Sequence, residues 1–300
     1  MKRPLAATVA ALSACATLLA GCGSNSLSSG GSTSGQPSGS TLPAVQASQE
    51  LNAALPDAIR QAGVIEVGAD PTYKPNEYMD GTTIVGMNVE LLDAVAARLG
   101  IKAHWNPSAF DAILAGVQAA KYDIGSSSFT ITAARMETIT FTQYLNVGTQ
   151  WATLAGNPQG VDPKNPCGKT IAYQTGTTQQ DEMAAAQQQC ASNPIVELSY
   201  TGQDEVNNAL MIGKADAMLA DYPITQNAIR TSDGKMEALG EQYGAAPYGF
   251  AVAKDNTQLA EAISGALYDI KESGHYGAIL DKYGVSQAAV DAFPVNPKVS

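Results

Sequence analysis

Strand-like and helix-like segments alternate along the middle of this chain. Residues 63–68 (GVIEVG) form a short apolar run typical of a buried strand, and residues 88–99 carry apolar side chains at helical spacing, with Asn88 as the expected N-cap. A strand at residues 101–105, a helix at 110–117 and a strand at 122–129 follow. An order of strand, helix, strand and helix predicts an α/β unit of parallel strands with right-handed crossovers.

The same alternation starts again after Trp151. Strands are expected at residues 169–174, 195–198, 217–220 and 248–253, and helices at 180–189, 204–212 and, as a pair, 257–282. The chain from about residue 51 to residue 299 is long enough for one large domain or two lobes.

Residues 126–135 (SSSFTITAAR) follow a strand and have the composition of an anion site. Thr132 is expected to cap a short helix that carries Arg135 in its first turn, where the helix dipole disfavours a cation. A bound carboxylate would explain this placement, because N–H groups, hydroxyls and a guanidinium would converge on it. The alternative is a plain turn with Arg135 pointing to solvent.

The second unit offers a matching pair of features. Residues 175–179 (TGTTQ) precede the helix expected at 180–189, whose first turn carries Asp181 and Glu182. Asp221 ends a strand just before Pro223, so its carboxylate has the right sign for an ammonium group. Asp221 could equally be only the N-cap of the following helix.

The first residues predict export. Residues 1–21 combine Lys2 and Arg3 with an apolar run, as secretory signals do, and residues 19–22 (LAGC) resemble the lipobox of bacterial lipoproteins, with Cys22 as the lipidated residue. Residues 22–50 would be a flexible Ser/Gly-rich tether spanning roughly 25 to 30 Å. In an oxidising compartment Cys167 and Cys190 remain as a pair, and we expect them to form a disulfide.

Charge and residue usage exclude several functions. The formal net charge is -11, or -13 without Lys2 and Arg3, and no basic run is present to bind nucleic acid or anionic lipid. Only two histidines, His104 and His275, occur, and they lie far apart in the sequence, which leaves little from which to build a metal site or a Ser-His-Asp triad. We therefore expect no cofactor, no metal and no catalysis.

Five stretches together resemble the polar amino-acid family of bacterial extracellular solute-binding proteins, which includes histidine-, arginine- and glutamine-binding proteins. They are residues 68–73 (GADPTY), 84–91 (IVGMNVEL), 126–135, 174–179 (QTGTTQ) and 220–223 (ADYP). The match keeps the same order over nearly the whole mature chain. It implies a type II periplasmic-binding-protein fold with two lobes, each a mostly parallel sheet flanked by helices, joined by a two-strand hinge.

The resemblance also implies a function and a set of site residues. The protein would be a lipid-anchored monomer on the outer face of the cell membrane, where it captures a polar L-amino acid for an ABC permease. The ligand carboxylate would bind Ser128, Thr130, Arg135 and the backbone at Thr178; the ammonium would bind Asp221 and the Ser128 carbonyl; the side chain would meet Asp70, Tyr73, Phe110 and Gln143.

Two departures from the family pattern concern the side-chain pocket. Asn76 stands where many members have Phe, and Gln143 stands where Asp is common. Two other functions share the fold: a lipoprotein that presents its ligand to a sensor kinase, and an arogenate or prephenate dehydratase.

The expected layout places lobe 1 at residues 51–148 and 247–290, lobe 2 at 149–246, and a C-terminal tail at 291–300. The lobes would be linked near residues 148–150 and 245–247 and would close on the ligand.

Overall fold

The computed structural model describes residues 42–299 of the chain. The expected signal peptide, the lipidated Cys22 and most of the expected tether lie outside these residues. Eight strands form one sheet in the order β5-β1-β6-β11-β7-β10-β8-β9. Their bounds are β1 Val64–Ala69, β5 Lys102–Pro107, β6 Ile124–Thr130, β7 Ile139–Leu154, β8 Thr170–Gln174, β9 Val196–Tyr200, β10 Ala217–Asp221 and β11 Met236–Ala253. A three-stranded sheet contains β2 Thr72–Tyr73, β3 Glu77–Asp80 and β4 Thr83–Val85.

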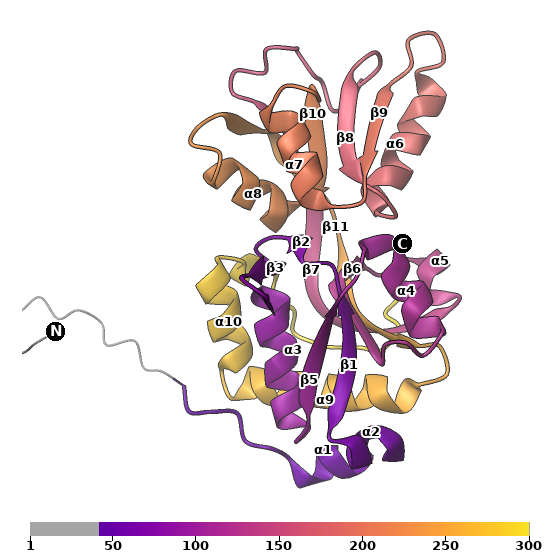
Figure 1. Cartoon of the computed structure of the whole chain (residues 1–300), viewed down its shortest axis with the longest axis vertical. Helices are drawn as coiled ribbons and strands as arrows, with labels where there is room; N and C mark the ends of the chain where they lie inside the picture. Colours follow the sequence, from indigo (N-terminus) through magenta and orange to yellow (C-terminus); the bar gives the residue numbers. More distant parts are fainter. Residues whose placement is uncertain (1–41, 300) are drawn as a thin grey trace, which may run out of the picture. The chain divides into compact units, whose positions relative to one another are not determined.

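Helices cover the sheet in two groups, shown in Figure 1. The helices are α1 Gln49–Ala54, α2 Asp57–Ala62, α3 Met87–Arg98, α4 Phe110–Gln118, α5 Ala133–Met136, α6 Thr178–Gln189, α7 Gln203–Met211, α8 Tyr222–Arg230, α9 Thr257–Glu272 and α10 His275–Tyr283. We call the group around β5-β1-β6 lobe 1, and α6 to α8 with β10-β8-β9 lobe 2. Their buried apolar side chains form separate clusters, so each lobe has its own core.

Two long strands, β7 and β11, run through both lobes (Figure 1). They pair with each other antiparallel, whereas β1 pairs parallel with β5 and β6, and β8 pairs parallel with β9 and β10. The β7-β11 register shifts between Leu239 and Tyr243, again before Ala246, and again after Tyr248. Regular pairing is therefore interrupted where the strands pass from one lobe to the other. The α/β architecture expected from the alternation is confirmed.

Two helix starts differ from the sequence expectation. Helix α3 has Gly86, not Asn88, at its N-cap position, and a Cβ at Gly86 would lie 2.2 Å from the Asn76 carbonyl oxygen. Asn88 lies inside the first turn with its side chain fully buried. Helix α6 begins at Thr178 rather than residue 180, because the Thr177 hydroxyl accepts a hydrogen bond from the Gln180 N–H.

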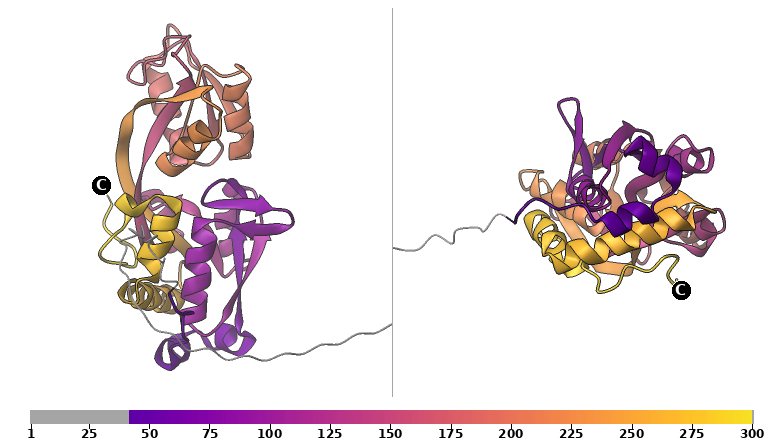
Figure 2. Two further views of the ribbon diagram at one scale, coloured as in Figure 1. Left: turned by 90° about the vertical axis from the view of Figure 1, so that its left-hand side faces the viewer. Right: turned by 90° about the horizontal axis from the view of Figure 1, so that it is seen from below.

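Both ends of the described chain pack against lobe 1. The Ser48 N–H donates to the Arg98 carbonyl, and His275 contacts the Pro43 carbonyl, so the packed chain starts before residue 51. At the other end, Phe293 is fully buried and Val295 pairs with Thr142, so residues 291–299 extend lobe 1 rather than trailing from it. Figure 2 shows α9 running beside α1 in lobe 1.

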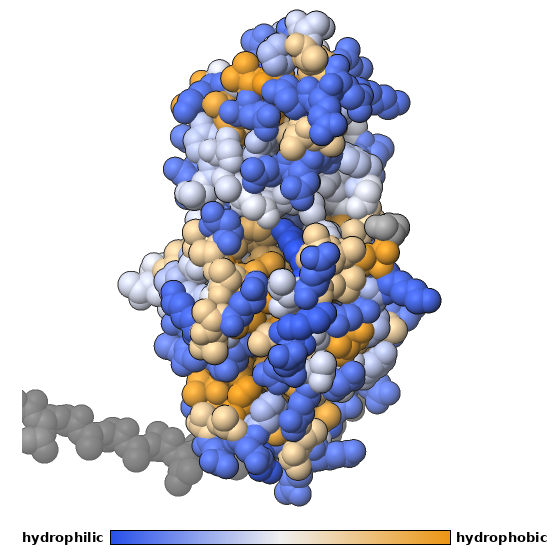
Figure 3. All heavy atoms as spheres, turned by 90° about the vertical axis from the view of Figure 1, so that its right-hand side faces the viewer, coloured by the Kyte–Doolittle hydropathy of each residue, from blue (hydrophilic) through white to orange (hydrophobic). Residues whose placement is uncertain are grey.

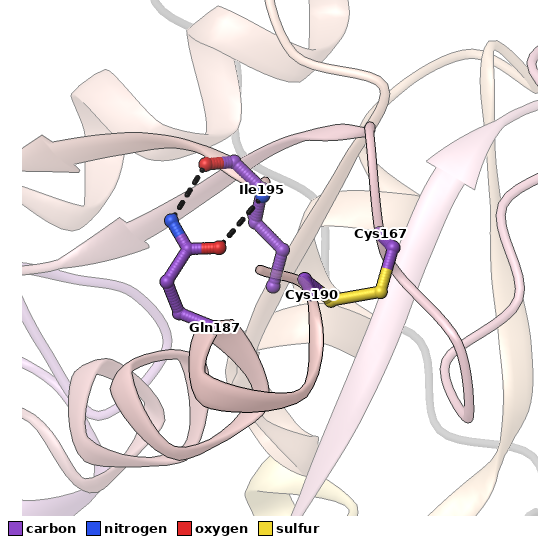
Figure 4. The surroundings of a disulfide bond; sticks show 4 residues. All are labelled: Cys167, Gln187, Cys190 and Ile195. Carbon is purple, nitrogen blue, oxygen red and sulfur yellow. Dashed lines mark hydrogen bonds between the residues drawn. A yellow bond between two sulfur atoms is a disulfide. The ribbon is translucent and has the colours of Figure 1, made fainter. Parts of the chain in front are cut away.

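The expected disulfide between Cys167 and Cys190 is confirmed (Figure 4). It joins the loop before β8 to the C-terminal end of α6. Next to it, the Gln187 amide donates to the Ile195 carbonyl and accepts from the Ile195 N–H. Together these contacts fix α6 on the sheet, and α6 begins at the 175–179 loop.

The face of the molecule in Figure 3 mixes hydrophilic and hydrophobic residues. Large exposed apolar side chains are scattered over separate elements, among them Met79 on β3, Val196 on β9 and Tyr268 on α9. No helix within residues 42–299 has the length and apolar content needed to cross a bilayer.

Candidate functional site

A small pocket lies between the lobes. Lobe 1 contributes Tyr73, Phe110, Ser128, Thr130 and Arg135, and lobe 2 contributes Thr177, Thr178, Gln179 and Asp221. Residues expected from sequence to bind both ends of an amino acid are thus brought together.

Arg135 enters the pocket from α5. Thr132 caps this helix as expected, through a hydrogen bond from the Arg135 N–H to the Thr132 hydroxyl. The guanidinium donates to the Thr130 carbonyl at 2.7 Å and, across the lobes, to the Gly176 carbonyl at 2.9 Å. It also lies 5.7 Å from the ring centroids of Phe110 and Phe129. Arg135 therefore does not point to solvent, and a guanidinium has five N–H donors, so others remain for an anion.

Asp221 carries the opposite charge on the other lobe. It stands at the N-cap position of α8 but makes no side-chain cap bond, so capping alone does not explain it. Its carboxylate instead accepts from the Tyr73 hydroxyl at 2.7 Å and from the Gln179 amide at 2.8 Å. Burial raises the pKa of Asp221 above its ordinary value. Within residues 42–299 it has no ion-pair partner, so an ammonium group would find a desolvated acceptor there.

The N-terminus of α6 completes the anion side of the pocket. Thr177 caps the helix, and its hydroxyl donates to the Gln174 carbonyl at 2.6 Å. Thr178 is the first helical residue, and N–H groups at this position have no intrahelical acceptor. A carboxylate between Arg135 and Thr178 would gain from both the guanidinium and the helix dipole.

Tyr73 and Phe110 supply the apolar walls of the pocket. Phe110 stacks on Phe129 with ring centroids 4.8 Å apart, which fixes its orientation. Tyr73 is held by its hydrogen bond to Asp221, and burial raises the pKa of its hydroxyl well above the ordinary value. Both rings line the pocket, and the sandwich around a ligand side chain stays a prediction of the family resemblance.

Asp70 lies next to the pocket without lining it. Its carboxylate accepts from Thr72 at 3.0 Å (N–H) and 2.8 Å (hydroxyl), and also from the Gln174 amide of lobe 2. Burial raises the pKa of Asp70. The Gln174 Oε1 atom is buried and has no hydrogen-bond donor among the described residues. Asp70 and Gln174 thus form a further polar contact between the lobes.

Gln143 is not part of this pocket, in contrast to the expectation. The β7-β11 register shifts at this point, because Leu145 pairs with Tyr248 whereas Gln143 pairs with Gly249. The neighbouring Tyr144 is fully buried in the lobe 1 core, and the Gln143 backbone N–H donates to the Pro294 carbonyl.

The Ser128 side chain also departs from its expected role. Its hydroxyl oxygen accepts from the amides of Asn76 and Asn88, each at 2.9 Å, and donates to Glu77. These groups are buried behind the pocket, which leaves the Ser128 backbone, not its hydroxyl, for a ligand.

Two pocket residues, Thr177 and Gln179, and the neighbouring Gln174 were missed by sequence reasoning. Thr177 and Gln179 belong to the recognised 175–179 loop, but their contacts depend on where α6 begins. Gln174 ends a strand, where only its partner across the lobes, Asp70, reveals its position.

Comparison with known proteins decides the family. The description "bacterial extracellular solute-binding proteins, family 3" matches residues 65–286. The chain belongs to this family. The resemblance seen in the five sequence stretches is therefore confirmed at the family level.

Two similar proteins are named as arginine-binding and as lysine/arginine/ornithine-binding. The chain is 34% identical over 300 residues to the arginine-binding protein ArgT of Corynebacterium glutamicum, covering 98% of this chain and 96% of that protein. It is 28% identical to the lysine/arginine/ornithine-binding periplasmic protein of Escherichia coli, covering 77% and 89%.

Solved structures of similar proteins confirm the type II periplasmic-binding-protein fold. An ancestral arginine-binding protein bound to arginine matches with a TM-score of 0.70 at 27% identity, covering 74% of this chain and 98% of that one. The ancestral amino acid-binding protein AncCDT-1, described as a precursor of cyclohexadienyl dehydratase, matches with a TM-score of 0.69 at 25% identity, covering 76% and 98%.

Proposed function

We propose that this protein binds an L-amino acid with a cationic side chain between its lobes and delivers it to an ABC importer. L-Arginine is the leading candidate for this ligand. The observation that carries this proposal is the pairing of Arg135 on lobe 1 with the buried Asp221 on lobe 2 across one small pocket. A free amino acid is a zwitterion, and its two charged groups match these two residues in sign.

The α-carboxylate would bind the free donors of Arg135, the Thr130 hydroxyl and the backbone N–H of Thr178. Charge-assisted, bidentate contacts of an arginine with a carboxylate are among the stronger hydrogen bonds in proteins. The α-ammonium would bind Asp221 and the Ser128 carbonyl. An ammonium group there would also offset the cost of burying the Asp221 charge.

Acceptors near the aromatic walls support a cationic side chain. The buried Gln174 Oε1 has no donor among the described residues, and the Asp70 carboxylate lies beside the same amide. A guanidinium offers five N–H donors in a plane and stacks on aromatic faces, as Tyr73 and Phe110 would allow. The names of the relatives, arginine-binding and lysine/arginine/ornithine-binding, favour the same class of ligand.

The proposal includes export and anchoring. Residues 1–21 would be removed as a signal peptide, Cys22 would carry the lipid, and the uncharged residues 23–49 would tether the domain outside the membrane. The descriptions "extracellular" for the family and "periplasmic" for relatives support an extracytoplasmic location. Metabolic labelling with a fatty-acid analogue should mark the full chain and leave Cys22→Ala unmarked.

Ligand identity can be tested directly. Mass spectrometry of protein purified without denaturation should release an amino acid, since closed binding proteins often retain their ligand. Calorimetric titration of stripped protein should then rank L-arginine and L-lysine above L-glutamine. Asp70→Asn should weaken L-arginine more than L-glutamine. Equal affinity for all three amino acids would contradict the cationic side chain, and no binding of any amino acid would contradict the function.

The likeness to AncCDT-1 makes a dehydratase the second candidate. Its description names an amino acid-binding precursor of an enzyme, so fold and pocket alone do not separate binding from catalysis. Turnover of added prephenate or arogenate by the purified domain would establish the enzyme.

A role in presenting ligand to a sensor kinase would use the same pocket. It predicts that the loaded form binds that receptor instead of a permease.

A further inference from the structure

Behind the pocket lies a carboxylic acid for which the proposed function has no use. Glu77, the first residue of β3, has a fully buried side chain. Its Oε1 atom accepts from the Asn88 amide at 2.5 Å and its Oε2 atom accepts from the Ser128 hydroxyl at 3.3 Å. Ser128 itself lines the ligand pocket, so Glu77 is one side chain away from the ligand.

The surroundings of Glu77 disfavour a negative charge. Within residues 42–299 it has no ion-pair partner, and the charged groups that act on it are the acids Asp70 and Asp221. The first N–H groups of the nearby helix α3 are already bonded, from Met87 to the Pro75 carbonyl and from Asn88 to the Asn76 carbonyl. Burial raises the pKa of Glu77 well above its ordinary value.

Unused acceptors around Glu77 fit a neutral acid. The Oδ1 atoms of Asn76 and Asn88 are buried and have no donor among the described residues. A half-turn of the Asn88 amide exchanges its oxygen and nitrogen, which would let a protonated Glu77 donate to Oδ1. The turned amide would no longer donate to Ser128, so Asn76 and Glu77 would then hold the serine hydroxyl. A buried acceptor left without a donor is costly, and the donors available to Oδ1 are a proton on Glu77 and the buried Tyr144 hydroxyl.

The cluster acts on an unusual backbone. Ser128 has a φ of 57°, in the left-handed region that non-glycine residues rarely adopt. At this point β6 has a bulge against β11, because Phe129 pairs with Gly249 whereas Gly125 pairs with Ala251. Such a conformation persists when its surroundings hold it, and here three buried side chains bind one hydroxyl. Asn76, the departure from the family pattern, is one of them.

We propose that Glu77 is kept as a neutral acid and, with Asn76 and Asn88, is a positioning residue that holds Ser128 in the conformation that the ligand site requires. Loss of the Glu77 proton places an uncompensated charge in this cluster and weakens ligand binding. The proposal rests on the proposed function only in its choice of ligand.

Other titrating groups must be separated from Glu77. Those that face it are Tyr144 on β7, Tyr73 on β2, Asp70 after β1 and Asp221 at the end of β10. The substitution Glu77→Gln removes one titration and leaves these groups in place. The ratio of wild-type to variant affinity at each pH therefore isolates Glu77.

The test uses Glu77→Gln, Glu77→Ala and the control Glu261→Gln, which makes the same substitution on the exposed surface of α9. Calorimetric titration with L-arginine near pH 6 should give Glu77→Gln within about twofold of wild type, since the amide mimics the neutral acid. Glu77→Ala should lose roughly fivefold or more, because the Ser128 contact is gone. Toward alkaline pH, wild type should lose affinity relative to Glu77→Gln, and Glu261→Gln should follow wild type.

Stability gives a readout that needs no ligand. A raised pKa means that folded wild type holds a proton that the unfolded chain releases above about pH 4.3. Its melting temperature should therefore fall relative to Glu77→Gln as pH rises beyond that value, because stability falls where the folded state binds more protons. Infrared difference spectra at neutral pH should show the carbonyl band of a protonated acid in wild type that is absent in Glu77→Gln.

The outcomes separate this proposal from the proposed function. Unchanged affinity in Glu77→Ala, or an equal loss in Glu77→Gln and Glu77→Ala at every pH, would overturn the positioning role while amino-acid binding stands. A charged Glu77, seen as a missing acid band and a destabilised Glu77→Gln, would overturn the neutral acid. If wild type binds no amino acid, the proposed function fails, and the melting and infrared measurements still decide the state of Glu77.

Discussion

Removing Arg135 should weaken ligand binding through two separate contacts. Its contact with the ligand carboxylate would be charge-assisted, and such hydrogen bonds contribute about 1.5 to 3 kcal/mol. Its bond to the Gly176 carbonyl joins the lobes at 2.9 Å, and a neutral acceptor of this kind contributes about 0.5 to 1.5 kcal/mol to the closed form. Arg135→Ala should therefore cost about 2 to 4.5 kcal/mol, which is roughly thirtyfold to two-thousandfold in affinity.

Isothermal titration calorimetry of stripped protein with L-arginine measures this loss. Arg60→Ala is the matched control, because Arg60 is an exposed arginine on α2 that pairs with Asp57. Folding of Arg135→Ala should survive, since α5 keeps its Thr132 cap and no residue of α5 is buried. An affinity within about twofold of wild type in a folded Arg135→Ala variant would refute the reasoning and remove Arg135 from the site.

Four further predictions follow from the described contacts. Asp221→Asn should strongly weaken L-amino acids but hardly affect des-amino analogues; equal losses for both would remove Asp221 from the ammonium role. Burial raises the pKa of Asp221, so its carboxylate should be protonated at a higher pH than an ordinary aspartate, whose pKa is about 3.9. As pH is lowered from about 7, calorimetry should therefore show the affinity of wild type falling at a pH above that value. Reduction of the Cys167–Cys190 bond, which spans 23 positions, should lower the free energy of unfolding by roughly 3 kcal/mol, measured by denaturant titration with and without reductant. Small-angle scattering should show a smaller radius of gyration on saturation with ligand, and confirmed affinity with an unchanged radius would contradict hinge closure.

The sequence predicted the fold well because its signals are local and periodic. Apolar spacing identified the strands and helices of both lobes, and the Thr132 cap and the cysteine pair were read from single residues. Errors occurred where a distant contact decides a boundary. Helix α3 starts at Met87 because Gly86 must pass close to the Asn76 carbonyl, and residues 43–48 join lobe 1 through Arg98 and His275.

The candidate site was predictable in part. Arg135 in a first helical turn is unfavourable without an anion, whereas Asp221 was equally compatible with a helix N-cap, and the structure brings both to one pocket. Gln143 does not line the pocket, and it stands where the pairing of β7 with β11 shifts, a feature that the sequence does not reveal. Gln174 was missed because its partner Asp70 lies on the other lobe.

The contacts of Asn76 and Glu77 could not be predicted from the sequence. In the sequence, Asn76 is only a departure from a family pattern and Glu77 is an ordinary acid in a turn. In the structure, both side chains contact the hydroxyl of Ser128, and within residues 42–299 Glu77 has no ion-pair partner. Ser128 has a backbone in the left-handed region and lines the pocket. The Asn76 amide donates to the same Ser128 hydroxyl that is bonded to Glu77. The side chains proposed to hold the Ser128 backbone thus include a departure from the family pattern, whereas Arg135 and Asp221, which are proposed to contact the ligand, match that pattern.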